Sequence, residues 1–164
     1  MAIASSVRQY LDAQHAQFDV LEHAPTMTAM QSAEVCHIPA GQLAKAVLLD
    51  IADDHLLAVL PADHRIQLAD LRSELGERPR LSTEREVEGI FDDCAMGAVP
   101  PLGSIYGVEL IIDDRLREQP DIYFEAGDPR SLIHMDRAEF SRLTGDARHG
   151  RFSEHWADRW PPMA

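Results

Sequence analysis

The sequence has little of what marks membrane or secreted proteins. No segment approaches the ~20 consecutive apolar residues that a helix needs to cross a bilayer. The first residues lack the basic start and apolar centre of a signal peptide. Two cysteines, Cys36 and Cys94, are too few for a disulfide framework. We therefore predict a cytoplasmic protein whose thiols are free.

Basic residues are also scarce. The 164 residues contain 15 Lys and Arg against 28 Asp and Glu, which gives a formal net charge of −13. Nucleic-acid binders usually carry a basic surface, because neutralising phosphates drives their affinity. The chain as a whole repels polyanions, so any contact with RNA must be local and brief.

Several sequence motifs of catalysis and cofactor binding are missing. The chain has no Gly-x-Gly-x-x-Gly or Gly-Lys-Ser/Thr phosphate loop and no Gly-x-Ser-x-Gly nucleophile elbow. His55 and His64 stand beside aspartates, but in turn-like segments without a second spaced ligand. No histidine is placed beside Cys94, which favours a small packed residue over a nucleophile. We expect neither a metal nor a cofactor.

The residues that are present alternate between strand and helix patterns over one domain. Helices are predicted over 5–16, 29–37, 66–76, 81–90 and 136–145, and strands over 18–23, 43–51, 55–60, 106–113, 121–127 and 131–135. Several strands are joined by short connections and must be antiparallel. The expected fold is a single α+β, or mixed α/β, domain over residues 1–145. Residues 146–164 show no clear period and are expected to form a loosely attached C-terminal tail.

Lys45 is an anomaly in the apolar strand over 43–51. It stands between Ala44 and Ala46, and lysine is almost never fully buried without a partner. The side chain could snorkel to water from the end of the strand. Alternatively, the small alanines could leave a cavity into which the ammonium projects as a fixed positive charge.

Two Gly/Pro-rich loops follow strands or helices further along the chain. The first, "CAMGAVPPLG" (94–103), is stiff and nearly uncharged. Free N–H groups around Gly97, Ala98 and Val99 could cradle a ligand oxygen, although a plain cross-over loop is the commoner explanation. The second, "FEAGDPRS" (124–131), contains Asp128, which could contact a ligand or simply form a turn.

In order, "EHAPTMT", "LAKAVLLD", "CAMGAVPPLG" and "DIYFEAG" resemble the YbaK-like editing domains related to the insertion domain of bacterial prolyl-tRNA synthetase. The family's His-x-Pro, strand lysine, Gly-x-x-x-Pro and Phe-x-Ala-Gly motifs correspond here to His23 with Pro25, Lys45, Gly97 with Pro101, and Phe124 with Ala126 and Gly127. The resemblance covers about residues 18–143. It implies a mixed, largely antiparallel curved sheet surrounded by helices.

The resemblance also implies a function, which is the hydrolysis of mischarged aminoacyl-tRNA in trans by substrate-assisted attack of water. Lys45 would hold the phosphate or sugar of the terminal adenosine, and the loop from Gly97 through Ala98 and Val99 to Pro101 would bind the aminoacyl carbonyl. The expected partners are the 3′ end of an aminoacyl-tRNA and, further, an aminoacyl-tRNA synthetase.

The remaining substrate-binding positions that we predict are His23, Pro25, Thr26, Gly127 and Asp128. Where many relatives read Gly-x-His, this chain reads Gly127, Asp128 and Pro129. Because that histidine helps to select the amino acid, we expect activity that is not confined to alanyl-tRNA of proline. The alternatives are a non-catalytic module that senses a small ligand or a protein, and a hydrolase of a small ester.

Overall fold

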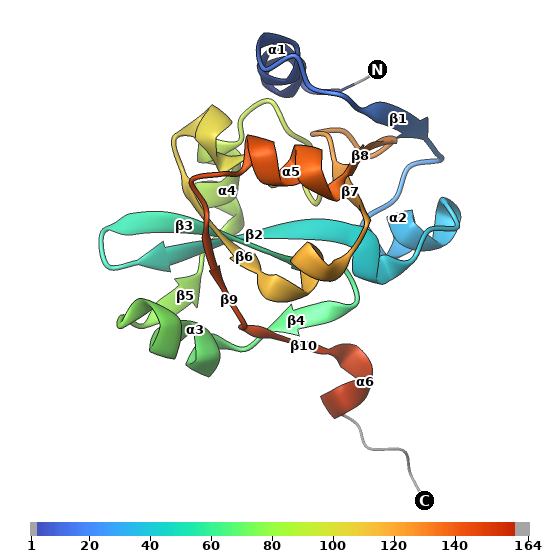
Figure 1. Cartoon of the computed structure of the whole chain (residues 1–164). Helices are drawn as coiled ribbons and strands as arrows, with labels where there is room; N and C mark the ends of the chain where they lie inside the picture. Colours follow the sequence, from blue (N-terminus) through green and yellow to red (C-terminus); the bar gives the residue numbers. More distant parts are fainter. Residues whose placement is uncertain (1–2, 160–164) are drawn as a thin grey trace, which may run out of the picture.

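The computed structural model describes residues 3–159 and leaves residues 1–2 and 160–164 outside (Figure 1). The helices are α1 (Ser5–Ala13), α2 (Ala29–Val35), α3 (Leu68–Leu75), α4 (Glu84–Ile90), α5 (Arg137–Leu143) and α6 (Trp156–Arg159), with 3-10 turns η1 (Ala40–Gln42), η2 (Gly103–Tyr106) and η3 (Asp114–Glu118). The strands are β1 (Asp19–Glu22), β2 (Leu43–Ile51), β3 (Asp54–Pro61), β4 (His64–Ile66), β5 (Pro79–Leu81), β6 (Glu109–Asp113), β7 (Asp121–Glu125), β8 (Ser131–Asp136), β9 (Arg148–Gly150) and β10 (Ser153–His155). Among these residues, no helix is long and apolar enough to span a membrane.

The main sheet is mixed and mostly antiparallel, as predicted. Its strand order is β1-β8-β7-β2-β3-β6-β9, and β5 pairs with β2 in addition. The hairpins β2–β3 and β7–β8 and the pairs β1–β8 and β2–β5 are antiparallel. The pairs β2–β7, β3–β6 and β6–β9 are parallel. The strand β2 is therefore central and contacts three others, which explains why it is almost continuously apolar.

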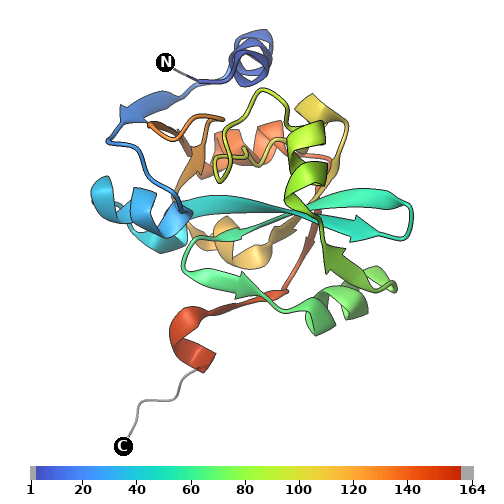
Figure 2. The same ribbon diagram turned by 180° about the vertical axis from the view of Figure 1, so that it is seen from behind.

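Both faces of the sheet are covered (Figures 1 and 2). On one face, Val7 and Leu11 of α1 and Phe140 and Leu143 of α5 join the larger hydrophobic cluster. On the other face, Leu71 of α3 packs in a second cluster with residues of β2, β3 and β6. The amphipathic helices predicted from sequence thus bury their apolar stripes against opposite sides of one sheet.

The helix ends follow the local signals in the sequence only in part. Thr83 and Glu86 form a reciprocal capping box at the start of α4. Gly76 ends α3 in the left-handed conformation. The Asp136 side chain accepts the Glu139 N–H at the start of α5, but the Glu139 carboxylate turns to the Gln17 N–H and to Arg142 instead of completing the box.

The expectation that residues 146–164 are loosely attached is wrong for residues 148–155. The strand β9 pairs with β6, and β10 pairs with β4. The fully buried Asp113 carboxylate accepts hydrogen bonds from the Phe152 N–H and the Ser153 hydroxyl, while the Phe152 ring is completely buried. Strands of three residues such as these carry no detectable period, so only tertiary contacts reveal them.

We predict that this C-terminal segment is part of the folding unit. The Phe152→Ala substitution should lower the free energy of unfolding by about 3–5 kcal/mol, because it leaves a cavity in the second cluster. The neighbouring Arg151→Ala change removes an exposed side chain and should alter stability by less than about 0.5 kcal/mol. Urea denaturation of both variants measures the difference. Equally small effects of the two substitutions would support the original expectation of a loosely attached tail.

Candidate active site

The candidate active site lies along one edge of β2, at residues that pair with no neighbouring strand on that side. Along this edge β7 pairs only with Leu43 and Ala44, and β5 pairs only with Leu49–Ile51. The Ala62 N–H donates to the Leu43 carbonyl on the β3 side, so the peptide groups of even-numbered residues face the opposite edge. Ala46 lies between the two short ladders, and its peptide groups therefore face the gap.

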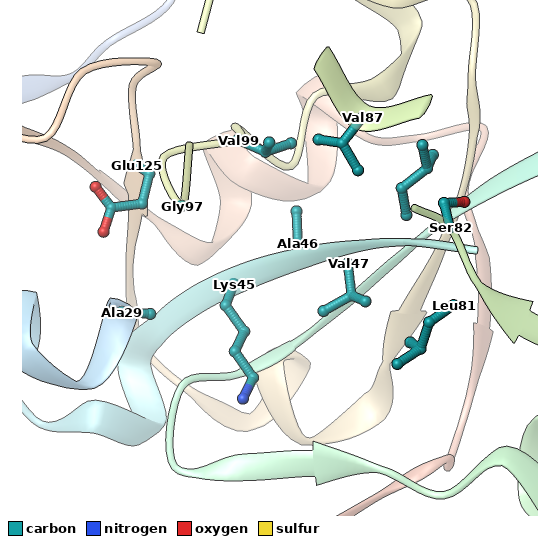
Figure 3. Close-up of a pocket in the computed structure, with 11 residues that line it drawn as sticks. Ala29, Lys45, Ala46, Val47, Leu81, Ser82, Val87, Gly97, Val99 and Glu125 are labelled. Carbon is teal, nitrogen blue, oxygen red and sulfur yellow. The ribbon is translucent and has the colours of Figure 1, made fainter. Parts of the chain in front are cut away.

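This gap is a pocket with a volume of about 250 Å³. It is lined by Ala29, Lys45, Ala46, Val47, Leu48, Leu81, Ser82, Val87, Gly97, Val99 and Glu125 (Figure 3). Lys45 of β2 and Gly97 and Val99 of the distant Gly/Pro loop therefore line the same pocket. In Figure 3 the loop lies on one side of the β2 edge, and the Lys45 amine extends on the other.

Lys45 is the only lysine in the sequence. It is half-buried, and desolvation lowers the pKa of its ammonium, an effect that the nearby Asp63 carboxylate partly opposes. Among the described residues it makes no ion pair within 4.0 Å. The ammonium is therefore a localised positive charge whose nearest formal counter-charge is not in contact with it.

The loop that faces Lys45 is shaped by Gly97. Its φ is +81°, and a Cβ at this position would lie 2.8 Å from the Met27 carbonyl oxygen, so both the conformation and the close approach require glycine. In the described part of the chain, the Gly97 and Val99 N–H groups have no hydrogen-bond partner, whereas the Ala98 N–H donates to the Ala95 carbonyl. Two of the three predicted N–H groups are thus unused within the described residues, and the third holds the turn.

The second Gly/Pro turn supports the first. The Gly127 N–H donates to the Ala98 carbonyl at 2.9 Å, and the Ala95 N–H donates to the Gly127 carbonyl at 2.8 Å. Gly127 has a φ of +92° and packs against Ala4 and Cys94, where a side chain would clash. The two motifs form one rigid unit, with Ala98 and Pro101 buried inside it.

The other predicted substrate-binding residues surround this unit without lining the pocket. The backbone N–H of His23 donates to the Arg130 carbonyl, and that of Thr26 donates to the Pro129 carbonyl, so the segment with Pro25 is tied to the turn after β7. The Asp128 carboxylate accepts hydrogen bonds from the Arg130 N–H and the Ser131 hydroxyl. This arrangement is that of a turn former.

Glu125 lines the pocket and was missed in the sequence analysis. Its side chain is buried, and one carboxylate oxygen accepts from the Ser32 hydroxyl at 2.9 Å, which in turn contacts the Thr26 hydroxyl at 2.6 Å. The Oε2 atom has no partner among the described residues. Burial, with a smaller contribution from Asp128, raises the pKa of Glu125 to about 7. A carboxylate in an apolar strand is the same signal that singled out Lys45.

One further polar cluster could in principle hold a metal ion. The potential metal-ligating atoms of Asp50, His55 and Glu86 lie within 4.8 Å of one another, but Asp50 already contacts Arg80 at 2.6 Å and Ser82 at 2.6 Å. A guanidinium at that distance disfavours a bound cation.

Cys94 is held between Asp93 and the Tyr106 hydroxyl. Burial raises the pKa of its thiol to about 12. Because the thiolate is the reactive form of cysteine, Cys94 is a poor nucleophile.

Comparisons with known proteins show the family and the fold. Residues 23–143 match the sequence profile of the aminoacyl-tRNA editing domain. The multifunctional Ser/Thr-tRNA deacylase ProXp-y of Escherichia coli K12 is 30% identical over 139 residues, which are 81% of this chain and 83% of that protein. The structure of a candidate trans-editing enzyme for prolyl tRNA synthetase has a TM-score of 0.79 and 25% identity, covering 93% of this chain and 99% of that one. A hypothetical protein of known structure shares the fold with a TM-score of 0.82 and 22% identity, covering 92% and 100%.

The fold and these matches therefore define an editing domain, a hydrolase that acts on the ester bond of aminoacyl-tRNA. This chain belongs to the aminoacyl-tRNA editing domain family.

We predict that Gly97 is needed for the shape of the loop. Gly97→Ala should lower the free energy of unfolding by about 1–3 kcal/mol, because alanine is strained at positive φ and its Cβ would overlap the Met27 carbonyl. Gly89→Ala is the matched control, because a Cβ there meets nothing within 4 Å and the helix should gain up to about 1 kcal/mol. Denaturant titrations compare the two, and a loss in both would point to a general intolerance of substitution.

We also predict that Glu125 makes stability depend on pH. Its pKa rises from 4.5 to about 7 on folding, so the folded state holds more protons than the unfolded state between those values. Stability should then fall as pH rises through this window, by up to on the order of 2–3 kcal/mol. Glu125→Gln cannot titrate and should remove this slope, whereas Glu109→Gln, at an exposed position, should keep it. Free energies of unfolding measured at pH 5 and pH 8 test this prediction. The same change with pH in the parent protein and in both variants would contradict the assignment of this pH dependence to Glu125.

Proposed function

We propose that this chain hydrolyses seryl- and threonyl-tRNA in trans. The observation that carries the proposal is a single pocket lined by Lys45, which forms no ion pair with the described residues, and by Gly97 and Val99, whose N–H groups have no partner among those residues. The activity named for the Escherichia coli relative supports the choice of amino acids. The tRNA contact is transient and made through the 3′ end. An aminoacyl-tRNA synthetase partner and a cytoplasmic location stay predictions.

In this mechanism the protein supplies position and electrostatics. The Gly97 and Val99 N–H groups donate to the carbonyl oxygen of the ester as negative charge develops on it. Lys45 binds the phosphate or ribose of the terminal adenosine and so fixes the ester against the loop. Water adds to the carbonyl carbon, the ester C–O bond breaks, and the departing ribose oxygen takes a proton. A hydroxyl of the substrate's own ribose assists the attack.

The amino-acid end of the pocket fits a short polar side chain. Ala29, Gly97 and Val99 are among the residues that line the pocket, whose volume is about 250 Å³. Glu125 is the only carboxyl group among the residues that line this pocket, and its free oxygen can accept from a hydroxyl or an ammonium. A site that forms such a hydrogen bond discriminates against a substrate lacking the group, because its own polar atom is then left unpaired.

The test is a deacylation panel over seryl-, threonyl-, alanyl- and prolyl-tRNA. Seryl and threonyl esters should be hydrolysed faster than alanyl esters, by about tenfold for one lost hydrogen bond. Hydrolysis confined to alanyl-tRNA of proline would refute the proposal. If no ester reacts while an adenosine nucleotide still binds, the chain is a sensing module.

Lys45→Ala is the control for an activity that belongs to this pocket. It should cut the rate on every reactive ester about tenfold or more, while the urea midpoint stays close to that of the parent. Lys45→Arg keeps the charge and should recover part of the rate. An unchanged rate in Lys45→Ala would remove this residue from the mechanism.

A further inference from the structure

An indole ring lies beside the far end of Lys45. Trp156, at the start of α6, is 46% exposed. The Lys45 Nζ lies 5.9 Å from its ring centroid, and the Arg65 Cζ lies 5.2 Å from it. The sequence analysis assigned no role to Trp156, which lies outside the 23–143 span of the family profile.

Trp156 is held by regular structure. The strand β10 pairs with β4 so that Glu154 stands opposite Arg65, and their side chains form an ion pair at 2.7 Å. The backbone N–H of Trp156 donates to the backbone carbonyl of Asp63 at 3.0 Å. The Arg65 guanidinium and the backbone that carries the ring are therefore held in place, which reduces the ordering needed when a ligand binds.

The ring continues the proposed active site. Lys45 lines the pocket, and its amine extends away from Gly97 toward β4 (Figure 3). A ligand held by its ester at the 97–101 loop and by its terminal sugar or phosphate at Lys45 would next reach Arg65 and Trp156. The direction of the Lys45 side chain thus indicates the path along which the nucleotide chain of the ligand would leave the pocket.

An exposed aromatic ring flanked by cations has the chemistry of single-strand nucleic-acid binding sites. Bases stack on the ring whatever their identity, and cations meet the phosphates between them. The chain has a net charge of −13 and repels polyanions as a whole. A polyanion can approach it where cations such as Lys45 and Arg65 are close together. Asp63 and Glu154 lie close by, but Glu154 is paired with Arg65, and Asp63 contacts His64 and His155.

We propose that Trp156 and Arg65, next to Lys45, form a binding site for the penultimate nucleotide of the tRNA 3′ end. The base stacks on the indole, and its phosphate lies against the guanidinium. This inference rests on the proposed function for its substrate, but it concerns a different part of that substrate from the amino acid. It explains how an acidic protein can hold the end of an RNA without a broad basic surface.

The experiment compares two substrates that differ only beyond the terminal adenosine, seryl-tRNA and the seryl ester of adenosine. Trp156→Ala should raise the KM for seryl-tRNA about tenfold or more and leave hydrolysis of seryl-adenosine unchanged. Trp156→Phe should keep most of the affinity. Arg65→Gln should act in the same direction, whereas Arg151→Gln removes an equal charge from the same terminal segment and should have no effect.

An unchanged KM for seryl-tRNA in Trp156→Ala overturns the inference. Equal losses on both substrates also overturn it, since Trp156 would then act only by supporting Lys45. If no ester is hydrolysed, the proposed function fails, and binding alone decides. The trinucleotide CCA should then shift the indole N–H resonance of Trp156, identified by its loss in Trp156→Phe, and a resonance that stays in place at saturating CCA excludes the nucleotide site.

Discussion

The interrupted edge of β2 is the constraint on which the rest of the site depends. A central strand normally satisfies its peptide groups on both sides. Here β7 leaves after Ala44 and β5 arrives only at Leu49, so a few residues in between keep an open edge inside a buried sheet. A continuous ladder would pair the peptide groups of Ala46 and would fill the pocket that Lys45 lines.

The open edge also divides the site into two parts that can change independently. In the proposed function, the amino-acid part lies with Gly97, Val99 and Glu125, and the loop there is held by the hydrogen bonds between Ala95, Ala98 and Gly127. The nucleotide part lies beyond Lys45 on the opposite side of the strand. Substitutions that alter which amino acid is accepted need not disturb how the RNA end is held, because the two sets of residues come from different segments.

The sequence was informative where a residue type conflicts with its local pattern. Lysine in an apolar strand and glycines in an uncharged loop each have ordinary structural explanations when taken alone, but the structure places both at one pocket. Asp128, the polar residue that the sequence singled out in the second turn, has its carboxylate engaged by backbone and hydroxyl donors nearby. Glu125, three residues earlier, lines the pocket instead. In a strand, the side chain that reaches a cavity depends on alternation and on which neighbours are missing, and neither can be derived from the turn chemistry.

The C-terminal strands escaped prediction for a different reason. The strands β4, β9 and β10 have three residues each, too few to show a period of two. Their positions are set by distant groups, above all by the buried Asp113 carboxylate that accepts from Phe152 and Ser153. A buried carboxylate is tolerated only when its oxygens have donors. Asp113 therefore needs the C-terminal segment to pack against the sheet, because that segment supplies these donors. The packing of this segment against the sheet also places Trp156 beside Lys45. The hydrogen bonds that the buried Asp113 requires thereby position an aromatic ring next to the proposed site.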